Sequence, residues 1–182
     1  ADIPEEAIAA YQRTKNDIDL EAILEREKII KHDVKARIEE FCKLAGYEHI
    51  HKGMTSRDLT ENIEQLQVLQ SLQHVQMLAV ATLSRLTDLS QQYAELPLTG
   101  RTHNVPAQIT TMGKRFANVA EEMILAFTTL EKISHTYPMK GLKGPVGTQQ
   151  DLLGLLGDQT KVEEFEQIIA KHLGFNNTMR SV

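Results

Sequence analysis

Tryptophan is absent from this 182-residue chain, aromatic residues make up 5% of it, and Cys42 is its one cysteine. A single cysteine excludes an internal disulfide and is typical of a reducing compartment, so we expect a cytoplasmic protein. Runs of β-branched residues are also missing. Leu, Ala, Glu, Gln and Lys, which favour helices, dominate instead. The composition therefore predicts an all-α fold.

Other absences exclude whole classes of function. No apolar run approaches the roughly 18 residues that a membrane-spanning helix needs. The formal net charge is −5 and no basic stripe is present, so nucleic-acid binding has no electrostatic basis. The pair His49-x-His51 matches no zinc-site spacing, and phosphate-loop, dinucleotide-binding and nucleophile-elbow motifs are missing. We expect no metal, no cofactor, no nucleic-acid partner and no membrane partner.

The two ends of the chain suggest a fragment. The sequence begins with Ala-Asp rather than Met, and it stops at Ser181-Val182 without a closing helix or a polar tail. We expect an excised or processed piece of a longer protein.

One helix is predicted from Pro4 to about Lys15, and a second helical stretch, which could be divided in two, is predicted before residue 47. Pro4 followed by two glutamates favours a helix start, because proline suits the first turn and acids suit the positive end of the helix dipole. Asn16, Asp17 and Asp19 offer caps for a second helix from about Leu20. A break near His32 and Asp33 stays open as an alternative, and Gly46 offers a C-terminal stop for this helical stretch.

A much longer helix is predicted next, because neither glycine nor proline occurs between Ser56 and Pro97. A helix of about 36 residues would be about 54 Å long. Apolar residues lie well beyond a single stripe, which indicates a coiled coil or a helix within a large, oligomeric bundle. The expected inner face holds Leu72, Val75, Ala79, Leu83, Leu86 and Tyr93, with further apolar residues at Leu69, Leu78, Val80 and Leu89.

The second half of the chain is predicted to continue with helices. Residues 100–106 are expected to be a loop, and Pro106 to open a second long helix that ends near Ser134. A glycine-rich stretch follows at 137–150, and helices are expected at 151–156 and 161–173. The inner face expected for the second long helix holds Ile109, Met112, Phe116, Val119, Met123, Phe127 and Leu130.

Four polar segments lie between or at the ends of these helices, where binding and catalytic groups concentrate. Imidazole suits proton donation near neutral pH. Thr55 and Ser56 at the start of the long helix could hold an anion, and Gly144 and Gly147 would let backbone amides approach one closely. The segments are Lys31-His32-Asp33, His49 to Asp58, Arg101-Thr102-His103-Asn104 and Gly141 to Thr148.

Each segment also has a purely structural interpretation. A histidine at a helix end commonly hydrogen-bonds locally. Thr55 and Ser56, with Asp58, could cap the long helix, and Gly-Pro-Val-Gly could be an ordinary turn. A non-catalytic helical module that serves oligomerisation therefore stays open as an alternative.

Taken in order, the four segments resemble motifs of the fumarase/aspartase superfamily and, within it, of the adenylosuccinate lyases. The resemblance covers nearly the whole chain, and four motifs in order are far more specific than any one of them. The matching runs are His32-Asp-Val-Lys-Ala36, His51-Lys-Gly-Met-Thr-Ser-Arg-Asp58, Gly100-Arg-Thr-His103 with Pro106 to Arg115, and Lys143-Gly-Pro-Val-Gly-Thr148.

This resemblance implies β-elimination of fumarate from adenylosuccinate, giving AMP, and from the related succinylated ribotide SAICAR, giving AICAR, in purine nucleotide biosynthesis. His103 matches the general acid, and His32 matches a histidine that orients the substrate and supports the acid. Another lyase of the superfamily is the alternative within this class. The residues that match substrate-binding positions are His51, Thr55, Ser56, Thr102 and Lys143.

The resemblance also implies an architecture. Residues 1–56 would belong to a small N-terminal helical domain, and residues 57–182 would form the first part of a truncated long-helix bundle. The family's base serine, on a Ser-Ser-x-Met-Pro loop, is not in this chain. We therefore expect the fragment alone to lack turnover, and the full-length enzyme to be a homotetramer whose sites combine residues of several subunits.

Overall fold

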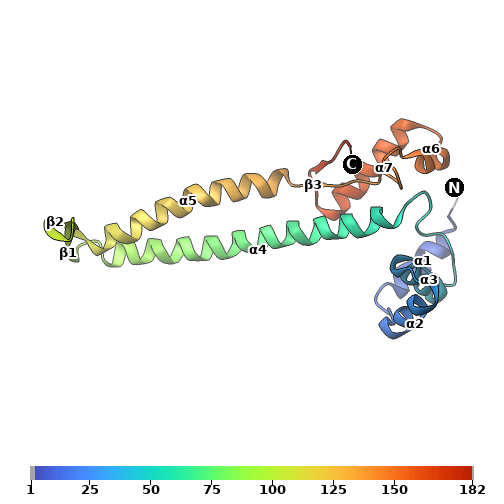
Figure 1. The fold of residues 1–182 in the computed structure, drawn as a ribbon, viewed down its shortest axis with the longest axis horizontal. Helices are drawn as coiled ribbons and strands as arrows, with labels where there is room; N and C mark the ends of the chain where they lie inside the picture. Colours follow the sequence, from blue (N-terminus) through green and yellow to red (C-terminus); the bar gives the residue numbers. More distant parts are fainter. Residues whose placement is uncertain (1–2, 182) are drawn as a thin grey trace. The chain divides into compact units, whose positions relative to one another are not determined.

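The computed structural model describes residues 3–181 and confirms the predicted helical fold (Figure 1). Short strands accompany the helices: β1 pairs antiparallel with β2, and β3 pairs in parallel with β4. The helices are α1 (Glu5–Thr14), α2 (Leu20–Ile30), α3 (Asp33–Ala45), α4 (Ser56–Gln92), α5 (Met112–Thr136), α6 (Gln150–Leu156) and α7 (Gln159–Leu173). The strands are β1 (Pro97–Thr102), β2 (Val105–Thr111), β3 (Pro138–Met139) and β4 (Asn177–Thr178).

The chain forms two compact units, and α4 contributes to both. Unit 1 contains Ala1–Leu66 and Pro138–Val182, and unit 2 contains Gln67–Tyr137. These compact units do not test the expected domain division between residues 56 and 57, which stays a prediction.

The sequence signals at the ends of the N-terminal helices act as predicted. The Asp19 carboxylate accepts hydrogen bonds from the backbone N–H groups of Glu21 and Ala22 and so caps α2. His32 is the N-cap of α3. Gly46 follows α3 with a φ of 75°, in the left-handed region that glycine adopts without steric cost.

The core of unit 1 is small and partly polar. Leu142, Leu152 and Val162 form one buried apolar cluster, which joins the glycine-rich stretch to α6 and α7. A second group of small buried residues, Ala7, Ala10, Val34 and Ala36, lies on α1 and α3. Small residues allow these two helices to pack closely.

In unit 2, α4 continues without a break, and Figure 1 shows α5 running back along it. The less exposed residues of α4 recur every three or four positions, as expected for a helix that packs along one side. The predicted face is correct at Leu72, Ala79, Leu83 and Leu86. The prediction was wrong at Val75, which is 49% exposed. The neighbouring Gln76 is the less exposed residue at this point of the helix.

The prediction that residues 100–106 are a loop and that α5 begins at Pro106 was wrong. Residues 97–111 form a β-hairpin instead, and α5 begins at Met112. The hydroxyl of Thr111 accepts a hydrogen bond from the N–H of Lys114 and caps the helix, which therefore begins six residues later than expected. Ile109 therefore lies on a strand and is 82% exposed. Val119, also predicted to face inward, is 54% exposed.

The contact between α4 and α5 is tightest beside the hairpin. The Gly113 N–H donates to the carbonyl of Tyr93, and the Ser90 hydroxyl donates to the carbonyl of Gly113. The rings of Tyr93 and Phe116 lie 6.0 Å apart between centroids. A side chain at Gly113 would overlap the carbonyl oxygen of Ser90, so glycine permits this close approach.

Candidate active-site residues

His32 and Ser56 bring the first two polar segments together in unit 1. His32 Nε2 lies 3.1 Å from Ser56 Oγ, and His32 Nδ1 accepts a hydrogen bond of 3.2 Å from the N–H of Lys35. Because Nδ1 accepts, the neutral ring carries its proton on Nε2 and donates to the serine. Capping of α3 thus fixes the orientation and the tautomer of an imidazole whose side chain is 47% exposed.

Asp58 connects the second polar segment to the fourth. Its carboxylate is 1% exposed. One oxygen accepts from the N–H groups of Lys143 (2.9 Å) and Gly144 (3.2 Å), and the other from those of Thr55 (2.9 Å) and Gly144 (3.1 Å). The bond from Thr55 is one half of a capping box at the start of α4. The amide of Gly144 therefore approaches an anion, and that anion is the chain's own Asp58.

Asn62, one turn along α4, holds the same glycine-rich stretch. Its side-chain oxygen accepts from the Gly141 N–H at 3.0 Å, and its nitrogen donates to the Gly141 carbonyl at 2.8 Å. Such a two-way bond imitates the pairing between strands. The side chain is 4% exposed, so α4 fixes Gly141 in a buried position.

Lys143 belongs to a buried ion pair. Its Nζ lies 2.8 Å from both carboxylate oxygens of Glu166 on α7, and the two residues are 5% and 8% exposed. Glu166 also accepts from the N–H of Leu142 at 2.8 Å. Charges removed from water need both a counter-charge and hydrogen bonds, and this pair has both. The ammonium of Lys143 therefore has its ionic partner within the chain.

One ring nitrogen of His51 makes no hydrogen bond within the described residues. Its Nε2 is buried and has no hydrogen-bond partner among residues 3–181. The residue has a φ of 62° and lines two adjoining cavities of about 230 and 470 Å³, whose walls are largely apolar. A buried ring nitrogen without a partner is costly, so a hydrogen bond from outside the chain would stabilise this imidazole.

Thr102 and His103 lie in unit 2, at the end of the hairpin. His103 and Asn104 form its two-residue loop, with φ values of 49° and 65°. Positive φ at both positions is the signature of a type I′ turn, which matches the twist of the flanking strands. Arg101 donates to the Asn104 carbonyl at 3.2 Å. Thr102 and His103 are exposed, and the turn carries the imidazole at its tip.

Three of the four polar segments thus meet within unit 1, and the third, around His103, lies in unit 2. Sequence reasoning assigned Asp58 only a possible capping role and missed Asn62 and Glu166. A signal existed for Asp58, because Thr55-x-x-Asp58 fits the capping-box spacing. No local pattern indicates Glu166, whose partners lie more than twenty positions earlier in the chain.

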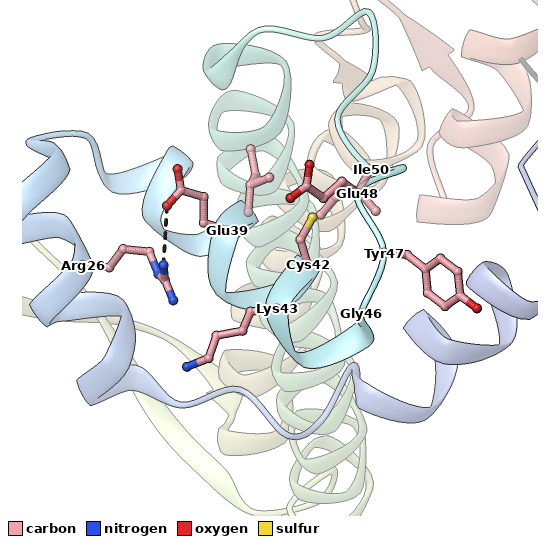
Figure 2. Close-up of a pocket in the computed structure, with 9 residues that line it drawn as sticks. Arg26, Glu39, Cys42, Lys43, Gly46, Tyr47, Glu48 and Ile50 are labelled. Carbon is pink, nitrogen blue, oxygen red and sulfur yellow. Dashed lines mark hydrogen bonds and ion pairs between the residues drawn. The ribbon is translucent and has the colours of Figure 1, made fainter.

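A further cavity of unit 1, of about 820 Å³, is lined by α2, α3 and the connection that follows α3 (Figure 2). Arg26 pairs there with Glu39, and its hydrogen bond with the buried Glu40 raises the pKa of its guanidinium. Burial raises the pKa of the Cys42 thiol, so the thiolate that nucleophilic chemistry needs is disfavoured. None of the predicted site residues lines this cavity.

Within residues 3–181, no group of three or more His, Cys, Asp or Glu side chains is arranged to hold a metal ion. No helix in the same range is long and apolar enough to cross a membrane.

Comparison with known proteins gives consistent results. A protein-family model described as lyase matches residues 2–181. Adenylosuccinate lyase of Saccharomyces cerevisiae is 32% identical over 154 residues, covering 83% of this chain and 32% of the relative. The adenylosuccinate lyase of Caenorhabditis briggsae is 32% identical over 180 residues, covering 96% of this chain and 37% of the relative. The chain therefore spans about a third of the length of these relatives.

Solved structures show the same fold. A fumarate lyase from Mesorhizobium sp. BNC1 matches 97% of this chain and 41% of its own, with a TM-score of 0.79 and 22% sequence identity. A 3-carboxy-cis,cis-muconate lactonizing enzyme from Pseudomonas putida matches 98% of this chain and 41% of its own, with a TM-score of 0.73 and 18% identity.

Proposed function

Because this chain belongs to the lyase family of the fumarase/aspartase superfamily, we propose that it is part of an adenylosuccinate lyase. The substrates are adenylosuccinate and SAICAR, and the reaction releases fumarate by β-elimination within purine nucleotide biosynthesis. The relatives named adenylosuccinate lyase, at about 30% identity over most of the chain, support this choice over other lyases of the superfamily.

In the proposed reaction, a base removes a proton from the carbon beside a carboxylate, and the resulting carbanion expels the nitrogen of the purine or its precursor. His103 protonates that nitrogen as it leaves, and Thr102 lies beside it in the same site. Support for the acid role comes from the two-residue turn, which leaves the imidazole of His103 exposed and free to reach a ligand. The base serine lies on a loop outside this chain.

The other predicted residues bind and orient the substrate. His32 orients it, and Thr55 and Ser56 contact its anionic groups at the start of α4. His51 contacts the phosphate, a role that the buried Nε2 without a partner supports. Lys143 also contributes to substrate binding, while its ammonium stays paired with Glu166. The observation that carries the proposal is the 3.1 Å contact between His32 and Ser56, which joins two of the predicted motifs in one cluster.

The complete enzyme is proposed to be a cytoplasmic homotetramer. Both long helices expose large apolar side chains that a partner helix would cover, among them Val75, Met77, Leu78, Val80, Val119, Ile124 and Leu125. Such surfaces on helices indicate an interaction face.

Fumarate release from adenylosuccinate tests the proposal. A complete polypeptide that carries this chain should change the ultraviolet absorbance of adenylosuccinate, and His103→Gln should slow the reaction by about 10²–10⁴-fold. An unchanged absorbance with the wild-type enzyme would reject the substrate and leave the non-catalytic oligomerisation module as the alternative. Near-normal kinetics of the variant would remove His103 from the acid role.

A further inference from the structure

The backbone of residues 141–144 is held by side chains rather than by a sheet or a helix. Each N–H in this segment donates to a side chain of α4 or α7: Gly141 to Asn62, Leu142 to Glu166, and both Lys143 and Gly144 to Asp58. We call this arrangement the 141–144 clamp. All three clamping residues are less than a tenth exposed, and hydrogen bonds are electrostatically stronger in such buried surroundings than in water.

Asp58 differs from the other two clamping residues because it also holds the start of α4. The same carboxylate accepts from Thr55, the residue before the helix, and from Lys143 and Gly144. The next residue, Ser56, contacts His32. One buried carboxylate therefore fixes the distance between the Thr55-Ser56 pair and the 141–144 segment.

We propose that Asp58 is a positioning residue of the lyase: it sets the geometry of the Thr55-Ser56 anion contacts relative to the segment that continues into Gly147 and Thr148. This inference rests on the proposed function. Asp58 does not touch substrate, because its oxygens are buried and occupied by backbone donors. It acts through the groups that do.

The chemistry of the side chain gives a discriminating substitution. In Asp58→Asn one oxygen becomes an NH₂ group, which cannot accept a hydrogen bond and would face backbone donors. Either Thr55 or Lys143 then loses its acceptor, and the two segments separate. Misplacement of binding groups by about 1 Å can cost about 10²-fold in rate.

The matched control is Asp19→Asn. Asp19 also caps a helix by accepting from two backbone N–H groups, but it is exposed and contacts neither segment. Asparagine is about as good an N-cap as aspartate, so this variant should behave as wild type.

The test is steady-state fumarate release by the complete enzyme, at a temperature where circular dichroism shows each variant folded. Asp58→Asn should raise KM at least about tenfold, because it displaces groups that bind the substrate. Asp19→Asn should leave KM within about twofold of wild type. A purely structural role would lower the folded fraction, and so the apparent kcat, at unchanged KM. An unchanged KM in folded Asp58→Asn overturns the inference.

A second measurement on the wild-type chain covers the case in which Asp58→Asn does not fold. The N–H groups of Lys143 and Gly144 should exchange as slowly as helix amides and show NMR couplings through their hydrogen bonds to the Asp58 carboxyl carbon. Fast exchange without coupling overturns the inference. Because this measurement needs no turnover, it also separates failure of the clamp from failure of the proposed substrate.

Discussion

Tyr11 shows how single side chains hold the segment that leads to His51. Its hydroxyl donates to the Tyr47 carbonyl at 2.6 Å and accepts from the His49 N–H at 2.8 Å. Its ring lies 5.2 Å from that of Phe41. Burial, which penalises the charged form, raises the pKa of this phenol. One residue of α1 therefore fixes the connection between α3 and α4.

Tyr11→Phe should destabilise unit 1 by about 1–3 kcal/mol, because it leaves a carbonyl and an N–H without partners. The raised pKa adds a dependence on pH. The contribution of Tyr11 is complete below the unfolded pKa of about 10, and it is lost as the pH rises through the higher folded pKa. Urea unfolding at pH 8 and at higher pH measures both effects. Tyr93→Phe in unit 2 is the control, and equal losses in the two variants would contradict this account.

The Lys143–Glu166 pair gives a second prediction at the residue scale. Glu166→Gln removes the counter-charge of a buried ammonium and should cost about 3–5 kcal/mol. Adding Lys143→Met should recover part of this loss, because no unpaired charge then remains buried. Glu163→Gln, at an exposed position on the same helix, should change the free energy of unfolding by less than about 0.5 kcal/mol. A small effect of Glu166→Gln would show that water reaches the pair.

Sequence reasoning at this scale found residues whose signal is local. The starts of helices hold His32, Thr55 and Ser56. Capping residues there can be recognised from the few neighbouring positions in the sequence. Glu166 and Asn62 could not be found in this way, because the hydrogen bonds by which they hold the 141–144 segment join residues more than twenty positions apart. Their roles depend on the tertiary path of the 141–144 segment.

At the scale of elements, Gly113 sets the approach of α5 to α4. A Cβ at this position would lie 2.7 Å from the Cα of Ala94 and would also overlap the Ser90 carbonyl. Gly113→Ala should therefore lower the stability of unit 2 by about 1–3 kcal/mol, because it overpacks a close contact.

Gly154→Ala is the matched control for this substitution. Gly154 is also helical, but a Cβ there would meet nothing within 4 Å, so alanine should stabilise α6 by up to about 1 kcal/mol. Thermal unfolding followed by circular dichroism compares the two variants. If both variants shifted the unfolding temperature in the same direction, helix propensity rather than packing would decide the outcome at Gly113.

Element boundaries were predictable where the sequence contains caps. The starts of α2 and α3 and the length of α4 follow from Asp19, His32 and the gap in glycine and proline. The hairpin was missed because Pro106 also suits a helix start, and because His103-Asn104 is a less obvious type I′ turn than Asn-Gly.

At the scale of the whole molecule, the exposed apolar residues of α4 and α5 favour association. Met77 and Leu125 are 63% and 69% exposed. Sedimentation velocity should show assemblies larger than a monomer that dissociate on dilution, and the double variant Met77→Lys/Leu125→Lys should shift them toward the monomer. The control is Gln73→Lys, at an exposed polar position. A wild-type chain that stays monomeric at all concentrations would contradict the proposed assembly.

The central claim is that His103 completes a lyase site together with the His32–Ser56 cluster, and that in the homotetramer these groups come from different subunits. Mixing two inactive variants of the complete enzyme, His32→Gln and His103→Gln, tests it most directly. After the subunits are dissociated and reassembled together, some tetramers would contain sites with both histidines intact, so fumarate release from adenylosuccinate should return. A mixture as inactive as either variant alone, in tetramers shown to contain both, would contradict the claim.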